Sequence, residues 1–233
     1  LIAFPEMATF IGHGFKKEAE VLASGETFQC LSNAGKDYQL WIHSGSIYEI
    51  NPYDEKRPFN TTMLINPAGE LVVSYRKIHP FDVELEGKPI VKESNQISPG
   101  QEIVTFDTLT VGHLGLSICY DLRFPELFRL MALEGANILL IPANFTLHTG
   151  KDHWEVLLRA RAIENGCYVL APAQWGVKPA FEAYGKSMII DPWGNVIAKA
   201  QDRTELITAD LDLEWLTHIR HHVMSLPFRR DYL

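Results

Sequence analysis

The chain has 233 residues, 46% of them hydrophobic, which is enough for a globular protein with a well-buried core. Its formal net charge of −8 argues against a nucleic-acid partner, because phosphate binding needs clustered Lys and Arg. No apolar run approaches the ~20 residues that cross a bilayer, and no signal peptide opens the chain, so we expect no membrane partner.

The chain order of apolar runs and turn residues predicts an α/β protein rich in short strands. The predicted strands cover residues 1–4, 40–50, 62–65, 71–75, 111–118, 138–141, 169–171, 187–190, 196–198 and 206–211. Helical spacing and end signals predict helices over residues 28–38, 125–134, 152–165 and 213–221. Residues 81–100 form a long polar connection, a type that is often functional or mobile.

Two turns of similar composition, residues 66–70 and 191–195, each separate a pair of predicted strands. Such hairpins favour two packed sheets with helices outside over a purely parallel sheet. No linker interrupts the chain, so we expect one domain over residues 1–233. Because the sequence starts at Leu1 inside a predicted strand, we also expect that a preceding segment of this domain is missing from it.

The three cysteines, Cys30, Cys119 and Cys167, are far apart and form no Cys-x-x-Cys pair. That pattern is typical of a cytoplasmic protein, and it predicts neither a disulfide framework nor a zinc cluster. Cys119 differs from the other two because it ends a strand and precedes a helix. A helix start lowers the pKa of a thiol, so Cys119 is a candidate nucleophile; a buried structural cysteine is the alternative.

Three more candidate residues occupy comparable places in the chain. Glu6 follows the first strand, Lys77 ends another, and Glu93 lies in the polar connection. Each of them alone is most simply an exposed charged side chain.

Together these segments resemble the nitrilase superfamily of carbon–nitrogen hydrolases. The resemblance rests on Glu6 in Phe-Pro-Glu, Lys77 in Tyr-Arg-Lys and Cys119 in Ile-Cys-Tyr-Asp, and it continues through residues 153–164, 184–187 and 191–194. It implies a four-layer α-β-β-α sandwich, here without the first strand and helix of the family, and a Glu-Lys-Cys catalytic triad.

The resemblance also implies a mechanism for cleaving an amide. Cys119 attacks the carbonyl to form a thioester, and Glu6 moves the protons. Lys77 and the backbone N–H of Tyr120 stabilise the oxyanion. Glu93 positions the substrate and holds Lys77, and ammonia is released. We therefore expect a small-molecule amide and water as the partners of the chain.

Residues 81–84, 93–95, 123–127 and 153–156 most resemble the branch that hydrolyses deaminated glutathione. The neighbouring branch, the omega-amidases, acts on α-ketoglutaramate-type acids and is the alternative. The same motifs would also suit acyl transfer to an amine, or a non-catalytic binding or scaffold protein of the same fold. Asn144, Phe145 and Thr149 are candidate substrate-binding residues, although their segment is equally typical of an ordinary surface loop.

His218 and His222 have the spacing of a helical metal pair, but no third ligand is evident and the implied mechanism uses no metal. We therefore predict no metal site and no cofactor. The last residues, 213–233, are rich in aromatic side chains and Arg, a composition typical of a protein–protein contact. Together with the resemblance, this predicts a homodimer or a higher homo-oligomer.

Overall fold

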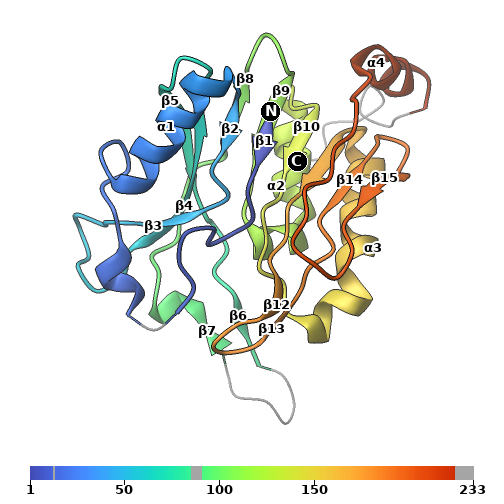
Figure 1. The fold of residues 1–233 in the computed structure, drawn as a ribbon. Coiled ribbons are helices and arrows are strands. Elements are labelled where there is room, and N and C mark those ends of the chain that lie inside the picture. Colours follow the sequence, from blue (N-terminus) through green and yellow to red (C-terminus); the bar gives the residue numbers. More distant parts are fainter. Residues whose placement is uncertain (13, 85–90, 224–233) are drawn as a thin grey trace.

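The computed structural model describes residues 1–12, 14–84 and 91–223 of the chain. Strand β4, with seven residues that are all buried, is the centre of the first sheet (Figure 1). It pairs antiparallel with β2 and β3 along one edge and with β5 along the other, and β1 lies parallel beside β2. The strands of this sheet are β1 (Ile2–Ala3), β2 (Ile42–His43), β3 (Ile47–Glu49), β4 (Phe59–Ile65) and β5 (Leu71–Arg76).

The second sheet has six strands in the order β15-β14-β11-β10-β9-β8. Its central strands β9, β10 and β11 are parallel, and the flanking strands are antiparallel. The continuous apolar run at β10 is fully buried, as is usual for a strand covered on both faces. The strands of this sheet are β8 (Thr105–Asp107), β9 (His113–Leu116), β10 (Ile138–Leu140), β11 (Tyr168–Ala171), β14 (Met188–Ile190) and β15 (Val196–Lys199).

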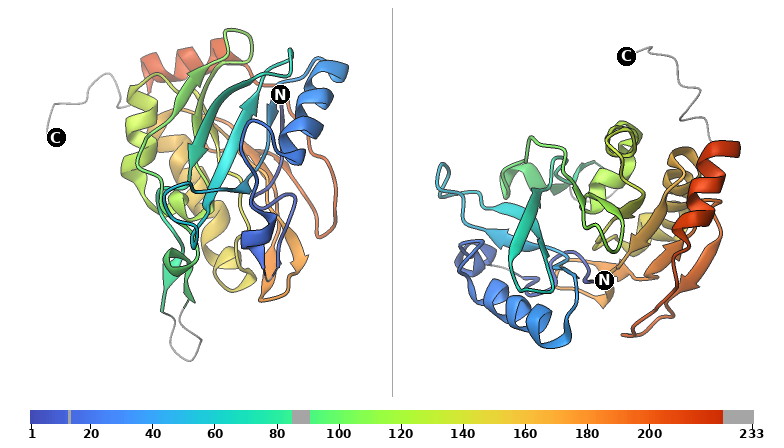
Figure 2. Two further views of the ribbon diagram at one scale, coloured as in Figure 1. Left: turned by 90° about the vertical axis from the view of Figure 1, so that its left-hand side faces the viewer. Right: turned by 90° about the horizontal axis from the view of Figure 1, so that it is seen from above.

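The helices cover the outer faces of the two sheets. Phe28 and Leu31 of α1 (Glu26–Tyr38) pack on the first sheet, whereas α2 (Pro125–Leu133) and α3 (Leu147–Asn165) pack on the second. Figure 2 shows α1 on one side of the molecule and α2 and α3 on the other. One buried apolar cluster contains residues of both sheets, including Leu64 and Leu116. The predicted four-layer α-β-β-α arrangement is confirmed.

Smaller elements complete the described chain. Two short pairs of strands lie at the same end of the molecule (Figure 1). The elements are β6 (Asp82–Val83) with β7 (Val91–Lys92), β12 (Trp175–Val177) with β13 (Glu182–Tyr184), the 3-10 helices η1 (Phe15–Glu18), η2 (Glu93–Asn95) and η3 (Cys119–Arg123), and the helix α4 (Leu213–His222).

Both predicted hairpins are present and their turns are alike. In one turn Asn66 N–H bonds to the Glu70 carbonyl, and in the other Asp191 N–H bonds to the Asn195 carbonyl. In each, the side chain of the first residue also accepts backbone N–H groups of the turn. This local Asx geometry explains why the composition alone predicted these turns.

Three sequence predictions are wrong. The single strand expected over residues 40–50 is divided into β2 and β3 at Gly45, which has a φ of 73° and no room for a Cβ beside the Pro5 carbonyl. Helix α3 begins at Leu147, so Thr149 lies in its first turns instead of in a loop. Residues 206–211 form no strand.

None of the helices within residues 1–12, 14–84 and 91–223 is long and apolar enough to cross a membrane. The dimer prediction partly rests on aromatic and basic residues near the end of the chain. These residues lie outside the described part. They are Phe228, Arg229, Arg230 and Tyr232.

His43 on β2 is a buried polar residue of the first sheet whose hydrogen bonds define its protonation state. Its Nδ1 faces the N–H of Gly45 at 3.4 Å and therefore accepts, which leaves Nε2 to donate to Thr62 Oγ1 at 2.9 Å. Burial lowers the pKa of His43 to about 3. A proton on Nδ1 would set two N–H groups against each other, so this imidazole stays neutral.

Because His43 is neutral in the folded protein, we expect the free energy of unfolding to decrease as the pH falls. The unfolded chain binds a proton at His43 below a pKa of about 6.5, whereas the folded chain does not until about pH 3. The contribution of His43 is therefore complete above pH 6.5 and is lost as the pH falls toward 3. In urea unfolding at pH 7, 5.5 and 4, the free energy of unfolding should fall more steeply for the wild type than for His43→Gln. Equal slopes would contradict this account.

Candidate active site

Three strand ends bring Glu6, Lys77 and Cys119 together between the sheets. Glu6 follows β1, Lys77 follows β5, and Cys119 begins η3 after β9. All three are buried, with exposed fractions of 2%, 1% and 7%. Lys77 Nζ lies 3.0 Å from Glu6 Oε1. Glu6 and Lys77 both act on the pKa of the Cys119 thiol, which places the two charges close to the sulfur.

Glu93 joins the same cluster from η2. Its Oε2 and Oε1 lie 2.9 and 3.2 Å from Lys77 Nζ, and Oε2 also accepts the N–H of Phe81. Burial acts to lower the pKa of Lys77, but the charges of Glu6 and Glu93 outweigh it and hold that pKa well above its ordinary value. Lys77 is therefore a cation at neutral pH, held by two carboxylates.

The Glu6 carboxylate is held on both oxygens. Oε1 accepts hydrogen bonds from Lys77 Nζ and from Asn60 Nδ2, the latter at 3.0 Å. Oε2 accepts a hydrogen bond from the backbone N–H of Asn144 at 2.8 Å. Gln174 Nε2 donates to the carbonyl of Glu6 itself at 3.2 Å. These contacts orient the carboxylate toward the thiol without exposing it to solvent.

The backbone of Cys119 places the sulfur at a sharp strand-to-helix turn. Cys119 has a φ of 49°, a left-handed conformation that is uncommon for a residue with a side chain. Its N–H donates to the Pro142 carbonyl at 2.9 Å. The first hydrogen bond of η3 runs from Asp121 N–H to the Ile118 carbonyl, so the N–H of Tyr120 precedes that ladder and remains available for a ligand.

The expectation that the helix start lowers the pKa of Cys119 is wrong. Burial and the negative charge of Glu6 raise it well above the ordinary value, although Lys77 and the Asn144 N–H act in the opposite direction. The following helix is a 3-10 turn of five residues, too short to outweigh desolvation. The resting thiol therefore keeps its proton, and nucleophilic attack requires a base.

The three candidate substrate-binding residues have different places. Asn144 reaches the site through its backbone N–H to Glu6. Phe145 is buried, and its ring packs on Trp154 with centroids 5.1 Å apart. Thr149 Oγ1 bonds to Thr146 Oγ1 at 3.0 Å, a contact within the first turns of α3.

Sequence reasoning missed Asn60 and Arg123. Asn60 is a buried polar residue of β4, and because Thr61 and Thr62 beside it are buried polar residues too, no local contrast in the sequence singled it out. The Arg123 guanidinium lies over the rings of Tyr120 and Phe145, at 5.7 and 5.3 Å from their centroids. Within the part of the chain that the structure describes, Arg123 forms no ion pair with a carboxylate, which leaves a cation close to the nucleophile turn.

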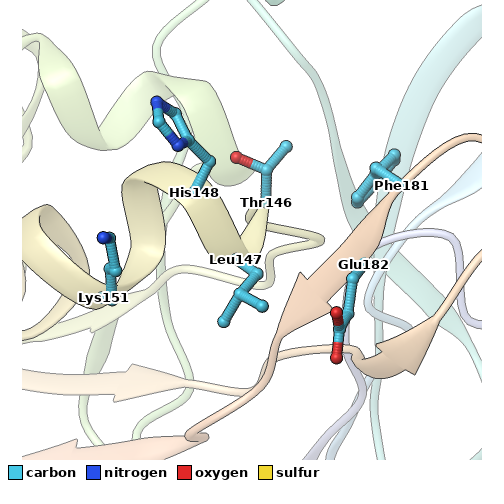
Figure 3. Close-up of a pocket in the computed structure, with 6 residues that line it drawn as sticks. All are labelled: Thr146, Leu147, His148, Lys151, Phe181 and Glu182. Atoms are coloured by element: carbon cyan, nitrogen blue, oxygen red, sulfur yellow. The ribbon is translucent and has the colours of Figure 1, made fainter.

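A cavity of about 400 Å³ lies between the start of α3 and β13 (Figure 3). Its lining residues are Thr146, Leu147, His148, Lys151, Phe181 and Glu182. None of the predicted catalytic residues lines it. Among the described residues, no group of three or more His, Cys, Asp or Glu side chains is placed to hold a metal ion, and the rings of His218 and His222 stack on each other.

Comparison with known proteins places the chain in a family. Residues 1–221 match the family model of the carbon-nitrogen hydrolases. Over its whole length the chain is 37% identical to the nitrilase and fragile histidine triad fusion protein NitFhit of Caenorhabditis elegans, of which it spans 54%. The crystal structure of that protein superposes with a TM-score of 0.89 over 98% of this chain and 56% of the other.

Two further relatives cover most of both chains. The deaminated glutathione amidase of Synechocystis sp. is 39% identical over 98% of this chain and 85% of its own length. The omega-amidase NIT2 of Mus musculus is 40% identical over 88% of this chain and 74% of its own. The family match and these identities agree with the fold, and the chain therefore belongs to the carbon-nitrogen hydrolase family of the nitrilase superfamily.

Proposed function

We propose that this protein is an amidase that hydrolyses a linear amide through a thioester on Cys119. One observation carries the proposal: the Cys119 thiol, the Glu6 carboxylate and the Lys77 ammonium lie together in one buried cluster. These are the nucleophile, base and charge-stabilising group that acyl transfer requires.

In the first step Glu6 takes the thiol proton while the Cys119 sulfur bonds to the amide carbon. The carbonyl electron pair moves to oxygen, and the Lys77 ammonium and the Tyr120 N–H stabilise that oxyanion. Loss of one such donor typically costs about 3 kcal/mol of transition-state stabilisation. Glu93 keeps the ammonium in position through its two contacts with Lys77 Nζ.

In the second step the tetrahedral intermediate collapses, the C–N bond breaks, and Glu6 returns the proton to the leaving nitrogen. Water then enters, Glu6 removes a proton from it, and the hydroxide attacks the thioester carbon. The C–S bond breaks, and the Cys119 sulfur recovers the proton from Glu6. Each proton thus passes through one carboxylate, whose orientation the Asn60 and Asn144 contacts maintain.

The role of Glu6 as base predicts that Glu6→Gln lowers both the rate and the pKa of the thiol. The value of kcat should fall by roughly 10²–10⁴-fold. The pKa of Cys119 should fall as well, because the charge and the hydrogen bond that disfavour the thiolate are removed. The pH profile of Cys119 alkylation, read by peptide mass spectrometry in a Cys30→Ser background, measures the second effect. Glu49→Gln, at a buried carboxylate paired with Arg76, is the control and should leave the profile unchanged. An unaltered or higher pKa in Glu6→Gln would refute this role.

We propose deaminated glutathione as the substrate, with α-ketoglutaramate-type acids as the alternative, because relatives of both names match the chain. Both compounds carry the same keto-acid acyl group with a free carboxylate. Arg123, which lies beside Tyr120 and has no carboxylate partner among the described residues, supports an anionic acyl group. The leaving groups differ: the simple amide releases ammonia, whereas deaminated glutathione releases a peptide amine, so the ammonia release expected from the resemblance applies to the alternative substrate alone.

Turnover of a matched panel of amides tests this function. Because the acyl group is shared, formation of 2-oxoglutarate follows both keto-acid amides, and an uncharged amide and a nitrile serve as comparison compounds. We expect turnover of the keto-acid amides, none with Cys119→Ala, and wild-type rates with Cys30→Ser. Arg123→Gln should raise KM for the acids and leave the uncharged amide unaffected. Turnover of the nitrile alone would contradict the amidase assignment, and no turnover at all would favour a binding protein of this fold.

We also propose that the protein acts in the cytoplasm as a homodimer. A reducing compartment preserves a thiol nucleophile. Exposed apolar side chains on the outer helices, Leu130 and Leu133 of α2 and Val156 and Ile163 of α3, support pairing through this layer.

A further inference from the structure

Asp121 is a completely buried carboxylate that the proposed reaction does not use. Its Oδ2 accepts the Tyr75 hydroxyl at 2.7 Å and the Ile118 N–H at 2.8 Å. Its Oδ1 lies 3.1 Å from the backbone N–H of His79 and 2.7 Å from Nδ1 of the same residue. Four polar groups therefore converge on one side chain just after Cys119.

These partners come from the two segments that hold the reacting groups. Tyr75 and His79 flank Lys77 in the chain, and Ile118 directly precedes Cys119. The Tyr75 hydroxyl also accepts the N–H of Ile78 at 3.2 Å. One carboxylate thus ties the end of β5, before and after Lys77, to the turn that presents the thiol.

The turn at Cys119 requires these hydrogen bonds because its backbone conformation is uncommon. The left-handed φ of Cys119 persists only where surrounding contacts impose it. The His79 ring stacks on Phe124 at the end of η3, with centroids 3.6 Å apart and an angle of 8° between the planes. Asp121 and His79 therefore hold η3 at both of its ends.

We propose that Asp121 is a positioning residue that sets the Cys119 sulfur relative to the Lys77 ammonium. The inference rests on the proposed function, since it assigns Asp121 to the chemical step of that site. Asp121 acts through backbone placement and does not touch the substrate. Its loss should therefore lower kcat and leave KM nearly unchanged, because misplacement of reacting atoms by about 1 Å can cost 10²-fold in rate.

Asp121→Asn tests the proposal, because the amide NH₂ of Asn would replace one carboxylate oxygen. It would then face either the donors from Tyr75 and Ile118 or the two donors from His79. We expect kcat for α-ketoglutaramate to fall roughly 10- to 100-fold, with KM within about twofold of the wild type. Asp191→Asn is the matched control: Asp191 is a buried carboxylate that holds the β14–β15 turn by backbone N–H groups, and β10 and β11 separate β14 from β9. It should lose stability but keep kcat per folded molecule.

Two further measurements keep the test decisive. Tyr75→Phe removes one of the four contacts and should lower kcat severalfold if Asp121→Asn does not fold. Alkylation of Cys119 in a Cys30→Ser background should be at least about fivefold faster in Asp121→Asn than in Asp191→Asn, because a loosened turn exposes the thiol. This readout needs no turnover, so it separates failure of the positioning role from failure of the proposed amidase. Folded Asp121→Asn or Tyr75→Phe with wild-type kcat, or unchanged alkylation, would overturn the proposal.

Discussion

The buried ammonium of Lys77 is the charge on which the arrangement of the site depends. An unpaired charge in a protein interior is strongly unfavourable, so Lys77 requires acidic partners that are equally removed from water. Glu6 and Glu93 supply them from segments far apart in the chain, and each lies within 3.0 Å of Nζ. The first sheet carries Glu6 and Lys77 at the ends of separate strands, and the 3-10 turn η2 brings Glu93 to the same point. Breaking either contact would leave a buried carboxylate without its counter-ion, which is why fold and site are coupled here.

Two carboxylates around one cation leave an excess of negative charge beside the sulfur. Burial and the negative charge of Glu6 raise the pKa of Cys119 and keep the thiol protonated at rest. The site is thus suited to a concerted proton transfer to Glu6 during attack and unsuited to storing a reactive thiolate. The same excess charge attracts the proton that the leaving nitrogen later needs. Nucleophile activation and leaving-group protonation are two uses of one electrostatic arrangement.

Much of the fold could be predicted from local patterns. The two Asx-type turns, the apolar strand before Cys119 and the amphipathic helix α3 each have a signal within a few residues. The division at Gly45 had none, because its cause is the Pro5 carbonyl on a neighbouring segment. The gathering of Glu6, Lys77 and Cys119 came from resemblance to a family and not from spacing. The contacts that orient these groups join distant residues: Asn144 N–H and Glu6 are 138 positions apart, and His79 and Asp121 are 42 apart. The direction of the thiol pKa was also beyond the sequence, since it depends on how deeply the sulfur is buried.

The central claim is that the acyl group of the substrate passes through the sulfur of Cys119. Rapid acid quenching during turnover of α-ketoglutaramate, followed by peptide mass spectrometry, tests it most directly. The account predicts a thioester on the peptide that contains Cys119, absent from Cys119→Ala together with all turnover. An acyl group on Cys30 or Cys167, or sustained turnover by Cys119→Ala, would contradict it.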